Sequence, residues 1–274
     1  MSKVIFITGA SRGFGKIWAE AFLDRGDQVI ATSRGISGLN YLTEKYGSAV
    51  LALELDIADR AACFDALEKA KEQFGRVDVV INNAGTGVFG AVEETTEQAA
   101  RDLIDANFFG TLWITQAALP IMRAQGNGHI LQLSSALGIY SFPTVGIYSA
   151  SKFAVEGLSE ALAGEVKEFG INVTLIEPNG YSTDFGSSSV QSVANPVYDT
   201  LKADLYASPE FTGADVYGIP QATAEAILQL VDSSNPPLRF ILGKKALPLA
   251  KSAYAERLST WEEWNDISVK AHGL

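Results

Sequence analysis

The sequence contains few of the residues that would indicate a disulfide-stabilised or metal-binding protein. Among its 274 residues there are one cysteine, Cys63, and two histidines. A single cysteine excludes an internal disulfide, which is typical of proteins from a reducing compartment. No spacing of cysteine, histidine and carboxylates suggests a metal site, and we expect none.

Long apolar runs and an excess of positive charge are also missing. No run of 18 apolar residues predicts a membrane span, and the start of the chain has no apolar signal core. The formal net charge of −11 disfavours long-range attraction to nucleic acid or to an anionic membrane. We therefore expect a cytoplasmic protein whose partners are small molecules and further copies of itself.

What remains is the composition of an ordinary folded protein. Hydrophobic residues make up 47% of the chain and charged residues 19%. The length suits one large α/β domain or two small ones. Because no repeat, low-complexity segment or linker divides the chain, we expect one domain spanning residues 1–274.

Segments typical of strands and helices alternate along this domain. We expect strands at residues 4–8, 28–32, 49–55, 77–81, 129–133, 172–176 and 238–242. We expect helices at residues 16–25, 39–46, 59–74, 97–123 (kinked or interrupted at Pro120) and 147–169. Such alternation predicts a single-domain α/β Rossmann fold, a doubly wound parallel sheet of about seven strands with helices on both faces.

Two segments fall outside the alternation. Residues 184–220 are richer in serine, proline and glycine and show weaker periodicity. They are expected to form an irregular substrate lid with one or two short helices. Residues 244–274 look helical and carry Trp261 and Trp264, which would pack on their own core, cover a pocket or contact a neighbouring subunit.

A glycine-rich turn lies between the first expected strand and the first helix. Gly9, Gly13 and Gly15 follow the spacing T-G-x-x-x-G-x-G. At such a turn the N-terminal amides of the helix can bind a pyrophosphate, and glycine lets the backbone approach it closely. We interpret the turn as a dinucleotide site; the alternative is a structural tight turn.

The residues after the second strand bear on the choice of dinucleotide. A carboxylate that binds the adenosine ribose would be expected there, but Ser33 and Arg34 occupy the place. Arg34, and Arg12 within the turn, could instead pair with a 2′-phosphate. NADP(H) is therefore the expected cofactor, with NAD(H) possible as a second choice; the alternative is that both arginines are solvated surface residues.

Tyr148 and Lys152 are four residues apart and would share one face of a helix. A lysine ammonium about 4 Å from the phenol would contribute about 4 kcal/mol and lower the tyrosine pKa from about 10 to about 7. This spacing alone is more typical of a solvated helix surface. Ser135, which follows the fifth strand, and the glycine turn favour an acid–base site.

Several motifs in this order resemble the short-chain dehydrogenase/reductase family, across about residues 3–243. The matching segments are Thr8–Gly15, Asp56-Ile57, Asn82-Asn83-Ala84-Gly85, Asn107, Ser135, Tyr148-x-x-x-Lys152 and Pro178 to Thr183. One departure is Asn179, where the family usually has glycine after proline. Asparagine tolerates positive φ better than other non-glycine residues, so we expect Asn179→Gly to leave activity similar or higher.

The resemblance implies a role for each matching residue. Tyr148 would be the general acid/base, Ser135 would position the substrate oxygen, Lys152 would bind the nicotinamide ribose and Asn107 would hold a water in a proton relay. The implied cofactor-binding residues are Gly9, Ser11, Arg12, Gly13, Phe14, Gly15, Ser33, Arg34, Asp56, Ile57, Asn83, Ala84, Gly85, Tyr148, Lys152, Pro178 and Thr183. Structural alternatives remain: Asn107 could satisfy neighbouring backbone, Asp56 could cap a loop, and residues 82–85 could be a strand-ending turn.

The expected activity is NADPH-dependent, reversible reduction of a ketone or aldehyde. A dehalogenase of the same fold is disfavoured by the intact glycine turn and Lys152, whereas a sensor that binds NADP(H) without turnover remains the alternative. Apolar residues that would line the pocket, or else belong to the core, favour a bulky hydrophobic or aryl ketone: Leu137, Ile139, Phe142, Tyr181, Phe185, Tyr198 and Tyr206. The helices at 97–123 and 147–169 resemble subunit-pairing helices, which predicts a homotetramer, with a dimer as second choice.

Overall fold

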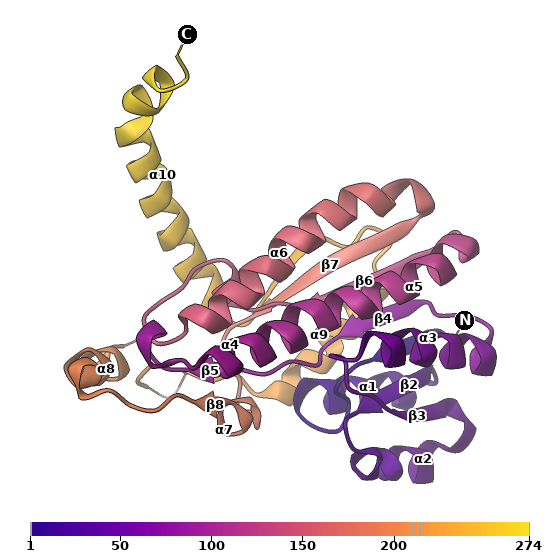
Figure 1. Cartoon of the computed structure of the whole chain (residues 1–274). Coiled ribbons are helices and arrows are strands. Elements are labelled where there is room, and N and C mark those ends of the chain that lie inside the picture. Colours follow the sequence, from indigo (N-terminus) through magenta and orange to yellow (C-terminus); the bar gives the residue numbers. More distant parts are fainter. Residues whose placement is uncertain (1, 210, 214, 274) are drawn as a thin grey trace.

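A computed structural model describes residues 2–209, 211–213 and 215–273. Seven parallel strands form the main sheet in the order β3-β2-β1-β4-β6-β7-β9 (Figure 1). Their bounds are β1 Val4–Ile7, β2 Gln28–Ser33, β3 Val50–Glu54, β4 Val79–Asn82, β6 Gly128–Leu133, β7 Ile171–Pro178 and β9 Arg239–Leu242. The order reverses after β1, where the chain crosses from β3 to β4. This is the predicted doubly wound sheet of about seven strands.

Helices cover both faces of the sheet, and the α-helices of the described chain have the following bounds. They are α1 Gly13–Arg25, α2 Asn40–Tyr46, α3 Arg60–Phe74, α4 Glu97–Ile104, α5 Thr111–Gln125, α6 Gly146–Val166, α7 Phe185–Ser188, α8 Asp199–Ala207, α9 Thr223–Asp232 and α10 Ala246–Lys270. None of these described helices is both long and apolar enough to cross a membrane.

The alternation of side chains along β1 separates the two layers of the core. Val4 and Phe6 pack with the apolar sides of α3, α5 and α6. Ile5 and Ile7 point the other way and pack with α1, α2 and α9. Successive strand residues face opposite sides, and both sides here are buried, which explains the near-continuous apolar runs of the strands.

Three details differ from the sequence-based expectation. The helix predicted at 97–123 is not interrupted at Pro120, which lies inside α5; its irregularity is a π-helical segment, Asp105–Gly110. A second, two-stranded parallel sheet pairs β5, Val88–Phe89, with β8, Val190–Gln191. Helix α9 was not expected, although the apolar spacing of Ile227, Leu230 and Val231 indicates it.

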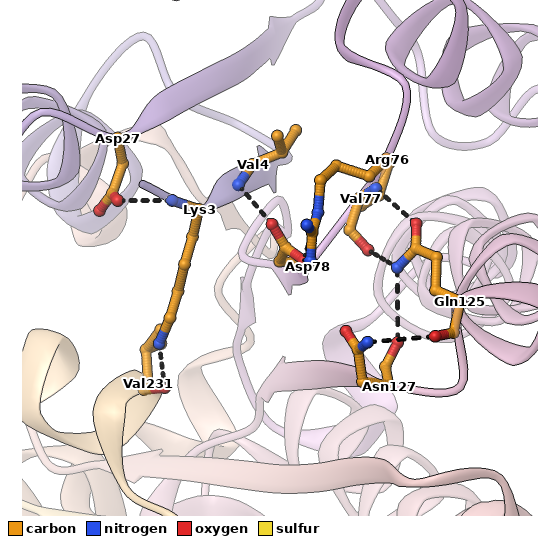
Figure 2. A network of polar contacts seen from close by, with 9 residues as sticks. All are labelled: Lys3, Val4, Asp27, Arg76, Val77, Asp78, Gln125, Asn127 and Val231. Atoms are coloured by element: carbon orange, nitrogen blue, oxygen red, sulfur yellow. Dashed lines mark hydrogen bonds and ion pairs between the residues drawn. The ribbon is translucent and has the colours of Figure 1, made fainter. Parts of the chain in front are cut away.

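The amino ends of the strands are closed by hydrogen bonds between side chains and backbone (Figure 2). Asp78 accepts from the backbone N–H of Val4 at 2.9 Å and pairs with Arg76. The amide of Gln125 bonds both the N–H and the carbonyl of Val77, each at 2.9 Å. These bonds occupy the polar groups at the amino ends of the strands. A ligand is therefore expected at the opposite edge of the sheet, where the strands have their carboxyl ends, as is usual for such sheets.

Candidate active site

The glycine turn leads directly from β1 into α1. Gly9 and Gly13 have φ of 69° and 55°, a region that favours glycine. Gly15 is needed for a different reason, because a Cβ there would lie 2.3 Å from the carbonyl oxygen of Gly9. The N-cap residue, Arg12, makes no capping bond with its side chain. The first amides of α1 are thus available to an anion, as a pyrophosphate site requires.

Hydrogen bonds from the end of β4 hold this turn in place. The hydroxyl of Thr8 accepts from the backbone N–H groups of Asn83 and Ala84 at 3.0 and 2.9 Å. The side-chain amide of Asn83 donates to the carbonyls of Thr8 and Gly9 at 2.8 and 3.1 Å. Asn83 therefore has the structural role left open by the sequence, since its amide supports the turn.

The loops after β2 and β3 reach the same edge. Ser33 is the last residue of β2, and its hydroxyl donates to the carbonyl of Gly35 at 2.7 Å. The loop then returns to the turn, because a Cβ on Gly38 would lie 2.8 Å from the Cβ of Ser11. Arg34 and Arg12 are exposed. The ion pairs formed by arginines in the described chain involve other residues, Arg25, Arg76, Arg101 and Arg239.

Asp56 and Ile57 follow β3. The carboxylate of Asp56 accepts from the N–H of Ala58 at 3.0 Å, so it caps its own loop while remaining exposed. Ile57 is buried against Gly110, where a Cβ would lie 2.7 Å from its side chain. Ile57 therefore fixes the position of this loop against the π-helical segment.

Thr183 and Phe14 join the loop after β7 to the glycine turn. A Cβ on Gly13 would lie 3.9 Å from that of Thr183. The ring of Phe14 stacks on Trp18 at 5.0 Å between centroids and meets the edge of Tyr181 at 5.1 Å. Tyr181 thus packs on the turn and not beside Tyr148.

The four expected catalytic residues come from three elements that meet at this edge. Ser135 follows β6, Asn107 lies in the π-helical segment, and Tyr148 and Lys152 share one face of α6. The ammonium nitrogen of Lys152 is 5.8 Å from the ring centroid of Tyr148 and donates to the carbonyl of Leu133 at 2.7 Å. Lysine and tyrosine are both buried, so the solvated-surface alternative is wrong.

Asn107 is held by its neighbours on both sides of its amide. Its oxygen accepts from the N–H of Thr86, and its nitrogen donates to the carbonyl of Thr86, each at 2.9 Å. The nitrogen also donates to the hydroxyl of Ser151 at 3.0 Å. A Cβ on Gly85 would lie 3.0 Å from the Asn107 oxygen and 3.9 Å from the Lys152 nitrogen. Asn107 therefore joins residues 85 and 86 to α6.

The pKa of Tyr148 differs from the sequence-based expectation. Burial raises the pKa of Tyr148 to about 12, and the Ser135 hydroxyl beside it acts in the opposite direction. Burial lowers the pKa of Lys152 to about 8. The expected value of about 7 for the tyrosine is therefore wrong for the protein alone, because desolvation disfavours both charged forms.

Aromatic rings form one wall beside Tyr148. Its ring centroid lies 5.6 Å from that of Phe185 and 6.4 Å from that of Phe89, and these two are 6.3 Å apart. Phe185 was expected at the pocket. Phe89 was missed, because it lies in the short β5, but its place four residues after the Asn-Asn-Ala-Gly segment could have indicated it.

A second aromatic group covers the loop before α6. The ring centroid of Phe211 lies 5.1 Å from that of Phe142 and 5.5 Å from that of Tyr206, each in an edge-to-face arrangement. The Tyr206 hydroxyl lies 3.3 Å from that of Thr144, which has a φ of 73°, the one positive φ outside glycine among the described residues. The residues expected at one pocket therefore lie in different places. The hydroxyl of Tyr198 donates to the carboxylate of Glu93 at 2.6 Å, and Ile139 is buried in the loop before α6.

Glu94 anchors residues 184–220 to the body. Its buried carboxylate accepts from the N–H of Ala91 at 2.7 Å and from that of Asn195 at 2.6 Å. It also pairs with Lys202 of α8 at 2.5 Å. The hydrogen bond from Lys202 is the main cause that lowers the pKa of Glu94 to about 2. No motif marked Glu94, because an acidic residue in a loop is usually solvated.

Asn179 does not have the conformation expected from its position. Neither it nor Gly180 has a positive φ. Its N–H donates to the carbonyl of Leu242 at 3.0 Å, and its side-chain oxygen accepts from the N–H of Lys245 at 3.4 Å. The side chain fills the space above Gly243, where a Cβ would lie 1.9 Å from that oxygen. Asn179 therefore joins β7 to the base of α10, and Pro178 ends β7 beside it.

Comparisons with known proteins give a consistent result. A family model described as short chain dehydrogenase matches residues 3–194. Oxidoreductase BOA17 of Botryotinia fuckeliana is 39% identical over 272 residues, which is 98% of this chain and 99% of that protein. A 3-ketodihydrosphingosine reductase of Bacteroides thetaiotaomicron is 37% identical over 259 residues, covering 94% of this chain and 92% of its own.

Solved structures agree. A short-chain dehydrogenase from Streptomyces avermitilis has a TM-score of 0.90 and 37% identity, over 98% of both chains. Because 98% of this chain is aligned, most of the 25-residue α10 lies within the part that matches this structure. An alcohol dehydrogenase from Thermococcus sibiricus, complexed with 5-hydroxy-NADP, has a TM-score of 0.74 and 26% identity, over 90% of this chain and 98% of its own.

Proposed function

The chain belongs to the short-chain dehydrogenase family, an oxidoreductase family, and on this premise we propose that it reduces a hydrophobic ketone or aldehyde with NADPH. One observation carries the proposal: buried Tyr148 and Ser135 lie at the same edge of the sheet as the uncapped start of α1. The proposed site therefore combines a dinucleotide-binding turn with a proton donor.

The glycine turn has the properties that a dinucleotide requires. Its glycines leave room where a Cβ at residue 9 or 15 would meet neighbouring backbone, and the amides of α1 can bind phosphate oxygens. Gly9, Ser11, Gly13, Phe14 and Gly15 would surround the pyrophosphate. Residues near the adenine would be Asp56 and Ile57, while Ala84, Gly85, Pro178 and Thr183 would lie along the nicotinamide half.

Two arginines support NADP(H) over NAD(H). Arg12 and Arg34 are exposed at the ends of adjoining loops, where a guanidinium can bind a 2′-phosphate through paired hydrogen bonds. Ser33, in place of a carboxylate, leaves that phosphate without repulsion. A similar alcohol dehydrogenase was solved with an NADP derivative, which supports the same choice.

Bound NADPH would supply the hydride, and the side chains of the chain would manage the carbonyl oxygen. The Ser135 hydroxyl would donate a hydrogen bond to this oxygen and so position it. Tyr148 would give it the proton, because a phenol with a pKa of about 12 is protonated at neutral pH. Lys152 would bond the nicotinamide ribose and, when charged, favour the phenolate that the transfer leaves. Asn107 would position residues 85 and 86, with a relay water as its further proposed role.

The aromatic wall supports a hydrophobic substrate. Phe89 and Phe185 border the phenol of Tyr148, and apolar walls with few polar groups favour bulky apolar ligands. A relative named as a 3-ketodihydrosphingosine reductase is consistent with such a ketone. We expect aryl or long-chain ketones to be better substrates than charged sugars.

NADPH oxidation measured across a panel of ketones tests this function. Turnover of hydrophobic ketones that is lost in Tyr148→Phe is the expected result. NADPH binding without oxidation of any ketone would contradict the proposal and would favour the sensor alternative. A clear kinetic preference for NADH would contradict the cofactor assignment alone.

The family resemblance also leads to a proposed assembly and location. We expect a homotetramer in the cytoplasm, with a dimer as the second choice. The outer side of the π-helical segment and of α5 supports subunit pairing, because Phe109 of that segment is 37% exposed and stacks on Trp113 of α5 at 5.5 Å between ring centroids. Light scattering of the purified protein measures the stoichiometry.

A further inference from the structure

Helix α10 leaves the body of the protein and extends away from it (Figure 1). It has 25 residues, about 37 Å in length. Among them only Ala246 and Ala250, at its base, are buried. Arg257 attaches the helix further, because it donates to the carbonyl of Ile139 at 2.8 Å and its guanidinium lies 5.9 Å from the centre of the Phe153 ring. Thr260 and Trp261 still border a hollow with Tyr140 and Ser141, but every residue of the helix beyond Trp261 is exposed.

Four large apolar side chains lie along one face of this helix. Leu247, Tyr254, Leu258 and Trp261 are 7, 4 and 3 residues apart, a spacing that places them in one stripe. Their exposed fractions are 46%, 47%, 50% and 61%. We call these four residues the arm stripe. A continuous exposed stripe of this kind is typical of an interface.

Charged residues beside the stripe specify what can cover it. Lys251 and Glu262 are 11 residues apart, which places them about 20° from each other around the helix axis and on the same flank of the stripe. In two parallel copies the same flank of each helix lies on opposite sides of the pair, so Lys251 and Glu262 would not meet. Two antiparallel copies would place each Lys251 against the Glu262 of the other copy, twice by symmetry.

We propose that α10 is a dimerisation arm, which pairs antiparallel with α10 of a second copy of this chain. The two-fold axis then crosses the helices near residues 256 and 257, midway between Lys251 and Glu262. Tyr254 of one copy lies at the level between Leu258 and Trp261 of the other. This arrangement interleaves the two stripes and closes into a dimer.

The same pairing accounts for the end of the helix. Trp264 and Ile267, each 59% exposed, lie off the stripe. In the antiparallel pair they reach the base of the other arm, at the level of residues 246–249. They meet the body of the second copy there. Glu262, Glu263 and Asp266 lie within two residues of Trp264 or Ile267 in the sequence, and their negative charge disfavours an anionic lipid surface as the occupant.

The arm is joined to the loop that carries the active site. Ile139, which accepts the bond from Arg257, lies between Ser135 and Tyr148. Pairing of two arms therefore fixes α10 against this loop from outside. Loss of pairing should loosen the loop without changing any residue of the site.

Light scattering of the full-length protein at about 50 µM tests the arm directly. The double variant Leu258→Glu/Trp261→Glu, the stripe variant, should have half the molar mass of the wild-type assembly. If α5 also pairs subunits, the assembly falls from four copies to two; otherwise it falls from two copies to one. The matched control places two glutamates on the opposite side of the same helix, Ser252→Glu with Ser259→Glu, and should keep the mass. Equal masses for the wild type and the stripe variant would overturn the proposal.

A charge exchange tests the direction of pairing. Lys251→Glu and Glu262→Lys should each raise the dissociation constant about tenfold, because two ion pairs become two repulsions. The double variant should return it to within about twofold of wild type. A double variant as weak as the singles would exclude the antiparallel pair. Sedimentation of the wild type with neutral phosphatidylcholine vesicles, lost in the stripe variant, would show that lipid covers the stripe and would also overturn the proposal.

Discussion

The carboxylate of Glu94 and the ammonium of Lys202 lie 2.5 Å apart although 108 residues separate them in the chain. The pair joins α8 of the lid to the segment after β5. We expect Glu94→Gln to raise KM for ketone about tenfold and to change kcat little, because the lid contributes to substrate binding while Tyr148 is untouched. Steady-state kinetics measure both parameters.

The low pKa of Glu94 gives this anchor a defined pH range. A carboxyl with a folded-state pKa of about 2 stabilises the folded protein above its ordinary pKa of about 4.3 and loses that effect as pH falls towards 2. Glu94 therefore stays ionised between pH 5 and 8, and its titration should not change KM in this range. A KM of Glu94→Gln equal to that of the wild type would show that the anchor does not contribute to binding.

Removal of the phenol hydroxyl should abolish turnover and spare cofactor binding. We expect Tyr148→Phe to lower kcat/KM at least about 1000-fold, since it removes the proton donor. Fluorescence titration with NADPH should give an unchanged dissociation constant. Tyr140→Phe is the control, because it removes a hydroxyl from the same loop region outside the four expected catalytic residues.

Buried Lys152 should lower the free energy of unfolding at neutral pH. Burial lowers its pKa from 10.5 to about 8, so the folded chain binds fewer protons than the unfolded chain between these values. The penalty is full below pH 8 and vanishes as pH rises to 10.5. Lys152→Met should therefore raise Tm at pH 7 by about 4 °C and by little at pH 10, while activity is lost. An equal change in Tm at both pH values would contradict this origin.

Arg34 should determine the preference for NADPH. Arg34→Ala is expected to raise KM for NADPH at least about tenfold and to leave KM for NADH nearly unchanged, because only the 2′-phosphate loses a partner. Arg123→Ala, an exposed arginine at the other end of the sheet, is the control. Equal changes in both KM values would indicate a general structural effect.

Asn179→Gly should lower stability without raising activity. The side chain fills the space above Gly243 and accepts from the N–H of Lys245, and its φ is not positive. We expect Tm to fall by about 2–4 °C, because these contacts are lost and glycine adds freedom to the unfolded chain. The earlier expectation of similar or higher activity treated φ as the deciding property. An unchanged or higher Tm would contradict the stabilising role of these contacts, and a higher kcat/KM would bear out the sequence-based expectation.

The sequence predicted the sheet and the cluster of Tyr148, Lys152, Ser135 and Asn107 because both depend on local patterns. Apolar strands, glycine spacing and a four-residue helical repeat can be recognised without knowing what lies beside them. Phe89, Glu94 and Thr144 escaped because their significance comes from partners far along the chain. The pKa of Tyr148 escaped because spacing indicates which charges are near but not how much water burial removes.

The hydrogen bonds between Thr8 and Asn83 also bear on how the protein is made. The glycine turn is synthesised early, but its support lies 75 residues later, directly after β4, the strand that pairs with β1 on the side away from β2 and β3. During synthesis the first 80 residues can form helices and a partial sheet but not a finished turn. A nascent chain therefore becomes able to hold a dinucleotide only after β4 has left the ribosome, so cofactor cannot assist the earliest steps of folding.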